Sequence, residues 1–160
     1  MGLDMYLEVR KFVPAYDYKV VDGNYEREYN PDYKSMLKSA GLDKLTSEES
    51  VGTTVSSTAI YWRKVNSIHN WFIQKCANGV DECQPIPVSR DRLQTLLATV
   101  EETIKSKNAE LLPPASGFFF GSTDVDEWYW NDLKYTKREL KNLLDKTESD
   151  SVDFIYQASW

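Results

Sequence analysis

The chain has 160 residues, a length that suits one domain with a buried core and is too short for two ordinary domains. Apolar residues make up 41% of it and aromatic residues 13%, which excludes disordered and low-complexity chains. The 25 Asp and Glu outnumber the 19 Lys and Arg, giving a net charge of -6 that argues against a protein that coats duplex nucleic acid. We therefore expect a single globular domain over residues 1–160.

The sequence also limits location and cofactors. It has no run of about 20 apolar residues that could span a membrane, and its start lacks the basic and apolar regions of a secretion signal. We expect a cytoplasmic protein without a membrane partner. Cys76 and Cys83 are too few for a disulfide framework, and with the single histidine, His69, they cannot complete a zinc site. We expect two reduced thiols, no bound metal and no cofactor.

The N-terminal third is predicted to contain a strand, a hairpin and a short helix. Apolar and polar residues alternate from Leu3 to Arg10, which indicates a half-buried strand. The tyrosine-rich stretch that follows has turn residues at Asp22-Gly23, which predicts a hairpin there. A short helix is expected over residues 33–40, ended by Gly41.

Two helices are predicted in the middle of the chain. Residues 58–76 carry Tyr61, Val65, Ile68 and Phe72 at three- and four-residue steps, which indicates an amphipathic helix over the whole segment. A second helix is expected to follow Ser89 as N-cap, with a regular leucine stripe.

The last third completes the predicted fold. The glycine-bracketed Phe118–Phe120 segment predicts an inner strand, and Ser122-Thr123-Asp124 is expected to start a third helix running to about Lys146. Residues 152–158 alternate loosely and indicate a closing strand. The fold class predicted is α+β, with an antiparallel or mixed sheet of the first, Phe118–Phe120 and last strands packed against about three helices.

One candidate site lies in the predicted 58–76 helix. No acidic residue occurs from residue 51 to residue 76, and on a helix Trp62, Asn66 and His69 would share one shoulder beside Arg63. Such donors near an indole could bind a phosphate or a nucleotide. The alternative is an ordinary solvated helix face.

The second candidate site is the turn at Gly121. Ser122 and Thr123, at the start of the predicted third helix, offer hydroxyls and free amides that can hold an anion. Against this, Asp124, Asp126 and Glu127 already complement the helix dipole, so capping is an alternative role.

Two aromatic residues on the third helix could bind a partner. Trp128 and Tyr135 are expected to project opposite the apolar face. Rings of this size carry much of the energy of protein interfaces, so they are either covered by another segment or anchor a partner.

Three segments resemble signature blocks of an uncharacterised family of small bacteriophage and prophage proteins. They are Met1–Leu7, Tyr61–Phe72 (YWRKVNSIHNWF) and Gly117–Trp130 (GFFFGSTDVDEWYW). The resemblance implies a phage accessory protein acting in the host cytoplasm. It also raises the expectation that the second and third blocks meet to form one concave, positively biased, indole-lined pocket.

Three functions follow. The first is a protein that binds a small anionic or nucleotide-like ligand without turnover, such as a host immune signal, through Trp62, Arg63, Asn66, His69, Ser122, Thr123 and Trp128. The second is an inhibitor of a host defence protein, anchored by Trp128 and Tyr135. The third is a metal-dependent hydrolase in which Asp124, Asp126, Glu127 and His69 converge on a metal. The sequence is also compatible with a homo-oligomer and with a component of the phage particle.

Overall fold

The computed structural model describes residues 2–47, 49–147 and 152–160. These pack as two compact units, the first made of Met1–Val9 and Ser57–Trp160 and the second of Arg10–Ser56. The organisation of residues 1–160 as one domain stays a prediction.

A four-stranded sheet organises the first unit. Its strands are β1 (Asp4–Pro14), β4 (Gly52–Arg63), β5 (Ile86–Val88) and β6 (Asp153–Ser159), in the order β4-β1-β6-β5. The part of β1 from Arg10 onward and the part of β4 up to Ser56 belong to the second unit. The closing strand β6 lies beside β1 and pairs antiparallel with β5, with Ile86 opposite Tyr156. The predictions of a strand at the start of the chain and another at its end are both confirmed, and the sheet is antiparallel.

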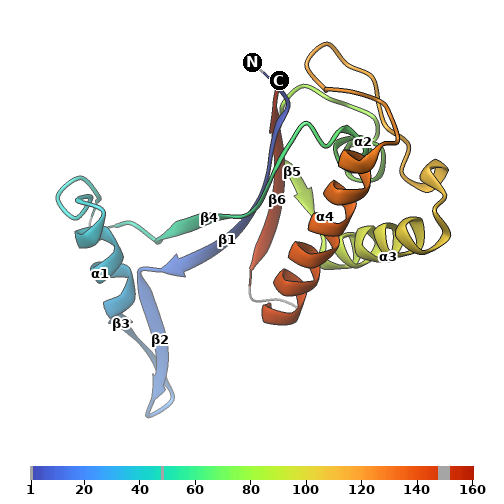
Figure 1. The fold of residues 1–160 in the computed structure, drawn as a ribbon. Helices are drawn as coiled ribbons and strands as arrows, with labels where there is room; N and C mark the ends of the chain where they lie inside the picture. Colours follow the sequence, from blue (N-terminus) through green and yellow to red (C-terminus); the bar gives the residue numbers. More distant parts are fainter. Residues whose placement is uncertain (1, 48, 148–151) are drawn as a thin grey trace. The chain divides into compact units, whose positions relative to one another are not determined.

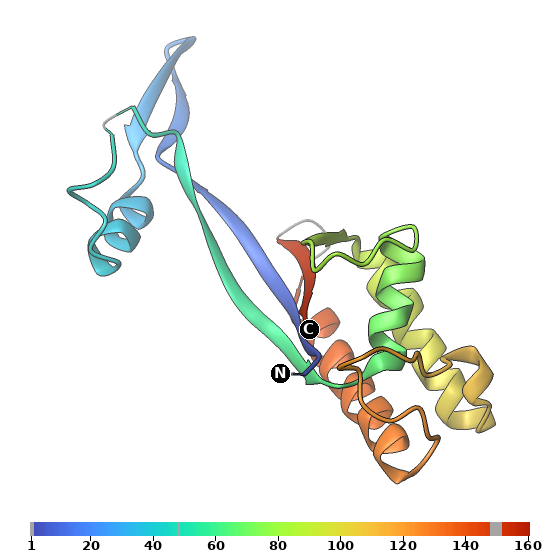
Figure 2. The same cartoon turned by 90° about the horizontal axis from the view of Figure 1, so that it is seen from above.

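Three helices of the first unit gather on one side of this sheet, as Figures 1 and 2 show. They are α2 (Asn66–Cys76), α3 (Arg90–Ser106) and α4 (Glu127–Lys146), and a single 3₁₀ turn, η1 (Ala109–Leu111), follows α3. The predicted α+β class is confirmed. None of the helices that the structure describes is long and apolar enough to cross a membrane.

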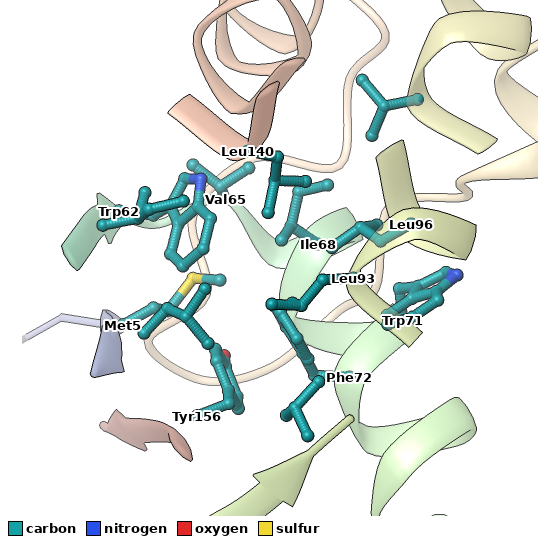
Figure 3. Close-up of a cluster of buried hydrophobic side chains, with 14 of the residues drawn as sticks. Met5, Trp62, Val65, Ile68, Trp71, Phe72, Leu93, Leu96, Leu140 and Tyr156 are labelled. Carbon is teal, nitrogen blue, oxygen red and sulfur yellow. The ribbon is translucent and has the colours of Figure 1, made fainter. Parts of the chain in front are cut away.

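The core forms where these helices cover the sheet (Figure 3). Alternation in β1 points Met5 and Leu7 inward, and both are fully buried, as is Leu3 just before the strand. The ring of Phe72 on α2 stacks on that of Tyr156 on β6, with centroids 4.0 Å apart. These residues belong to one buried hydrophobic cluster that spans the sheet and the helices, and its burial drives folding of the unit.

The prediction of one helix over residues 58–76 is wrong in its first part. Residues up to Arg63 belong to β4, where Ile60 and Trp62 point into the core and Tyr61 and Arg63 point outward. Lys64 then takes a left-handed backbone conformation with φ of 59°, which turns the chain into α2 at Asn66. Burial alternates from Ile60 to Arg63, but the residue types do not alternate, so the helical spacing through Tyr61 was the stronger local pattern.

The predicted Phe118–Phe120 strand is also wrong. A hydrogen bond from the Phe120 amide to the Gly117 carbonyl, 3.2 Å long, closes a turn there. The Phe120 ring folds back so closely that a Cβ at Gly117 would lie 2.6 Å from it. Phe118 is 94% exposed, so the three phenylalanines do not line a buried strand.

Caps fix the starts of the other two helices. Ser89 accepts a hydrogen bond from the Arg92 amide and begins α3, as predicted. Helix α4 begins later than predicted, at Glu127, because Asp126 is its N-cap and accepts from the Tyr129 amide at 3.1 Å.

The second unit contains the predicted hairpin and short helix. Strands β2 (Tyr16–Val21) and β3 (Asn24–Tyr29) pair antiparallel around Asp22 and Gly23, both with positive φ. Helix α1 (Pro31–Ser39) is capped by Asn30 and ends before Gly41. A small core of Val13, Ala15, Tyr33 and Leu37 holds this unit together.

The buried Trp62–Thr136 hydrogen bond gives a first prediction. Thr136 on α4 accepts from Trp62 Nε1 at 2.9 Å and donates to the Asp132 carbonyl at 2.8 Å. Thr136→Val leaves the buried indole N–H without a partner and should lower the free energy of unfolding by about 1–3 kcal/mol in urea titrations. Thr95→Val is the control, because exposed Thr95 bonds the Asp91 carbonyl in the same way. Equal losses in the two variants would contradict this assignment.

Candidate ligand-binding cleft

Two of the three sequence blocks meet at one cleft of the first unit, with a volume of about 330 Å³. One wall is the turn from β4 into α2, and the other is the loop before α4 together with the first turns of that helix. This volume lies at the lower end of the range for small-molecule sites. We call it the Arg63 cleft; it is lined by Arg63, Lys64, Val65, Asn66, Ser67, Pro114, Gly121, Ser122, Asp124, Asp126, Trp128, Tyr129 and Asp132.

Asn66 joins the two walls. Its Nδ2 donates to the carbonyls of Phe120 and Ser122, at 3.1 and 2.8 Å, and its Oδ1 accepts from the Ala115 amide at 3.2 Å. Asn66 itself is 4% exposed, so its polar atoms have little access to water. Asn66 was predicted to bind a ligand, but its polar atoms are instead used to hold the loop from residue 115 to residue 122 against α2.

The start of the chain supports the same loop. The Leu3 amide donates to the Phe119 carbonyl at 3.1 Å, and the Leu3 carbonyl accepts from the Lys64 amide at 2.7 Å. The aliphatic part of Lys64 passes close to two glycines, since a Cβ on Gly2 would lie 3.1 Å from Lys64 Cε and one on Gly121 would lie 3.2 Å from Lys64 Cβ. Gly121 has φ of 87°, so both space and backbone conformation favour glycine there.

The cleft has two cations on its first wall. Arg63 and Lys64 are exposed, and neither forms an ion pair with a residue in the described part of the chain. Sequence reasoning proposed Arg63 and did not single out Lys64. An unpaired guanidinium and an adjacent ammonium can accept a phosphate or carboxylate without first breaking an ion pair.

Three carboxylates line the opposite wall, so the predicted positive bias of the pocket is wrong. Asp126 caps α4, and Asp124 accepts from the Ser122 hydroxyl at 2.8 Å. Asp132 is half-buried, and none of the described side chains donates a hydrogen bond to it. Burial and the nearby Asp126 carboxylate raise the pKa of Asp132 to about 6, so it is mostly ionised at neutral pH.

Two aromatic residues of α4 complete the cleft. The indole of Trp128 is 76% exposed and free to stack on a planar ligand. The Tyr129 hydroxyl is not available, because it donates to the Leu112 carbonyl at 2.9 Å, and burial raises its pKa to about 12. Trp128 is therefore the indole that the cleft offers to a ligand.

Two of the residues predicted to bind a ligand are buried elsewhere. Trp62 is 2% exposed within the core, so it cannot stack on a ligand. His69 is 1% exposed; its Nδ1 lies 2.7 Å from the Tyr156 hydroxyl and its Nε2 lies 2.9 Å from Asp81. A carboxylate accepts only, so Nε2 donates to Asp81, and burial raises the pKa of Tyr156 well above its usual value, which keeps the phenol un-ionised beside Nδ1.

The remaining predicted residues differ in their availability. Ser122 lines the cleft, whereas Thr123 is exposed but does not line it. Tyr135 is half-buried: its hydroxyl donates to the Tyr61 carbonyl at 3.0 Å, and Arg138 lies 5.2 Å from its ring centroid. Tyr135 is thus partly covered by its own chain, and Trp128 is the more accessible of the two predicted anchors.

The geometry does not favour the metal-dependent hydrolase. That hypothesis requires His69 to converge with Asp124, Asp126 and Glu127, but His69 is committed to Tyr156 and Asp81. Within the ranges that the structure describes, no three His, Cys, Asp or Glu side chains are placed to hold a metal ion. Cys76 and Cys83 are free thiols, and burial raises the pKa of Cys76.

No protein-family model, no curated protein and no solved structure matches this chain. The phage-family resemblance of the sequence blocks therefore stays a prediction.

The role of Asn66 gives a second prediction. Asn66→Asp removes both donors and places a carboxylate against two carbonyls, a change expected to lower the free energy of unfolding by about 3 kcal/mol. The N-terminus of α2 offsets at most about 1 kcal/mol of this loss. Hydrogen exchange of the amides of residues 115–122 should accelerate more than that of α3.

Asn70→Asp is the matched control for this experiment. Asn70 lies one turn further along α2, is half-buried, and makes no side-chain hydrogen bond to the described residues. Its substitution should change stability by less than about 1 kcal/mol. If Asn70→Asp proves as costly as Asn66→Asp, Asn66 does not have the joining role assigned to it.

Proposed function

We propose that the chain is a phage accessory protein that binds a small anionic or nucleotide-like ligand in the Arg63 cleft and does not transform it. Its place of action would be the host cytoplasm, and sequestering a host immune signal is the role that fits a binding protein without turnover. The ligand's anionic group would lie against Arg63 and Lys64 and its ring against Trp128, while the Ser122 hydroxyl, which lines the cleft, already donates to Asp124.

The observation that carries this proposal is the presence of unpaired cations and an exposed indole in one cleft. Arg63 and Lys64 have no ion-pair partner among the described residues, although Asp124, Asp126 and Asp132 line the same cleft. Charges of opposite sign that share a cleft without pairing leave room for a ligand between them. An exposed ring beside such cations is the combination that binds a phosphate and stacks on a base.

Isothermal titration calorimetry with a panel of cyclic and linear nucleotides tests the proposal. At least one should bind, and Arg63→Ala should weaken its binding by about tenfold or more, because the variant loses a charge-assisted hydrogen bond to the anion. Arg92→Ala is the control, since Arg92 is exposed on α3 and does not line the cleft. The proposal fails if no nucleotide gives a heat of binding and the Arg63→Ala variant keeps the full biological effect of the unmodified protein.

A protein–protein inhibitor is the second candidate function. Trp128 is 76% exposed, although large aromatic side chains usually bury much of their surface, and the net charge of -6 suits a basic host protein. In this reading Trp128 is the anchor, with Tyr135 as a partly covered neighbour on the same helix.

Pull-down from host lysate separates the two functions. If the protein is an inhibitor, one host protein should be captured, lost with Trp128→Ala and retained with Arg63→Ala. A ligand-binding protein should instead show nucleotide binding that both substitutions weaken. Capture that survives Trp128→Ala would remove the observation on which the inhibitor function depends.

A further inference from the structure

The cleft contains a carboxylate that no described side chain pairs with. Asp132 is half-buried and lines the cleft, yet it receives no hydrogen bond from a described side chain and forms no ion pair with Arg63 or Lys64. Removing an ionised carboxylate from water without a compensating donor costs free energy. A ligand that brings its own N–H donors would recover that cost.

The helix places this carboxylate next to the exposed indole. Trp128 and Asp132 are four residues apart on α4, so they are neighbours on one face, with Cβ atoms about 5–6 Å apart. Both line the Arg63 cleft. A planar ring stacked on Trp128 therefore presents an edge to Asp132, while its anionic substituent reaches toward the wall with Arg63 and Lys64.

From this geometry we infer that the preferred ligand is a guanine nucleotide, with the base on Trp128, its N1–H and 2-amino groups donating to the Asp132 carboxylate, and its phosphate on Arg63 and Lys64. This inference rests on the proposed binding function. A carboxylate only accepts hydrogen bonds, and guanine presents two adjacent donors on one edge. Adenine and cytosine present an acceptor beside their amino group, and xanthine has a carbonyl where guanine has the amino group.

Calorimetry with guanosine and xanthosine 5′-monophosphates tests this assignment. The unmodified protein should bind the guanine nucleotide about tenfold or more tightly, the size expected for a hydrogen bond to a charged group. Asp132→Asn should reverse the preference, because its amide can donate to the xanthine carbonyl while its oxygen still accepts from N1–H. Asp145→Asn, a matched change at an exposed position of α4 outside the cleft, should leave the preference unchanged.

The pH dependence gives an independent readout. Guanosine and inosine 5′-monophosphates carry the same phosphate and differ by the 2-amino group, so the ratio of their affinities largely cancels phosphate titration. Ionised Asp132 can accept from N1–H and from the amino group at the same time, whereas the protonated carboxyl accepts at one oxygen only, and the pKa of Asp132 is about 6. The preference for guanine should therefore be present at pH 7.5 and shrink as the pH falls through that value, and Asp132→Asn should abolish this dependence.

The outcomes separate this inference from the function beneath it. Equal binding of guanine and xanthine nucleotides by the unmodified protein overturns the inference and leaves nucleotide binding intact. If no nucleotide binds but inorganic pyrophosphate does, and Arg63→Ala weakens it, the guanine assignment fails while an anion site survives. Absence of binding by every probe overturns both. The preference of the unmodified protein decides the matter even if Asp132→Asn fails to fold.

Discussion

The three hydrogen bonds of Asn66 are the constraint on which the cleft depends. The residues before α4 have neither a helix nor a strand of their own from residue 112 to residue 126. The Asn66 side chain holds them in place, together with one backbone bond to Leu3 and the bond from the Tyr129 hydroxyl to the Leu112 carbonyl. An amide side chain suits this role because it offers both donors and an acceptor at one position. Asn66 is also the first residue of α2, so its side-chain hydrogen bonds hold the loop in a fixed position relative to that helix.

This support allows the cleft to hold its charges apart. Arg63 and Lys64 belong to the turn between β4 and α2, whereas Asp126, Trp128 and Asp132 belong to α4 and its cap, and the core beneath fixes both elements. Rigid elements that carry opposite charges at a fixed separation pre-organise a site for a ligand with groups of both kinds. The His69 network with Tyr156 and Asp81 lies outside this cleft and fixes α2 to β6 and to the segment after α2.

Much of the fold was readable from local patterns, and the errors came where two patterns overlapped. The first and last strands, the Asp22-Gly23 hairpin and the Ser89 cap each depend on neighbouring residues, so the sequence contains their signal. The helix prediction failed for residues 58–63 because the apolar spacing through Tyr61 and Val65 fits a helix. Only the burial of Ile60 and Trp62 in the folded protein shows that this segment is a strand. The roles of Asn66 and His69 depend on partners that are distant in sequence, which no local spacing reveals.

The left-handed turn at Lys64 shows what the protein gives up to build this cleft. A side chain in that backbone conformation costs about 1–2 kcal/mol relative to glycine. Lysine at this position places a positive charge at the wall of the cleft. The aliphatic part of Lys64 has room because two of its neighbours, Gly2 and Gly121, have no side chain beyond a hydrogen atom. These two glycines are far apart in the sequence. Changes at any of these three positions would therefore be felt at the other two.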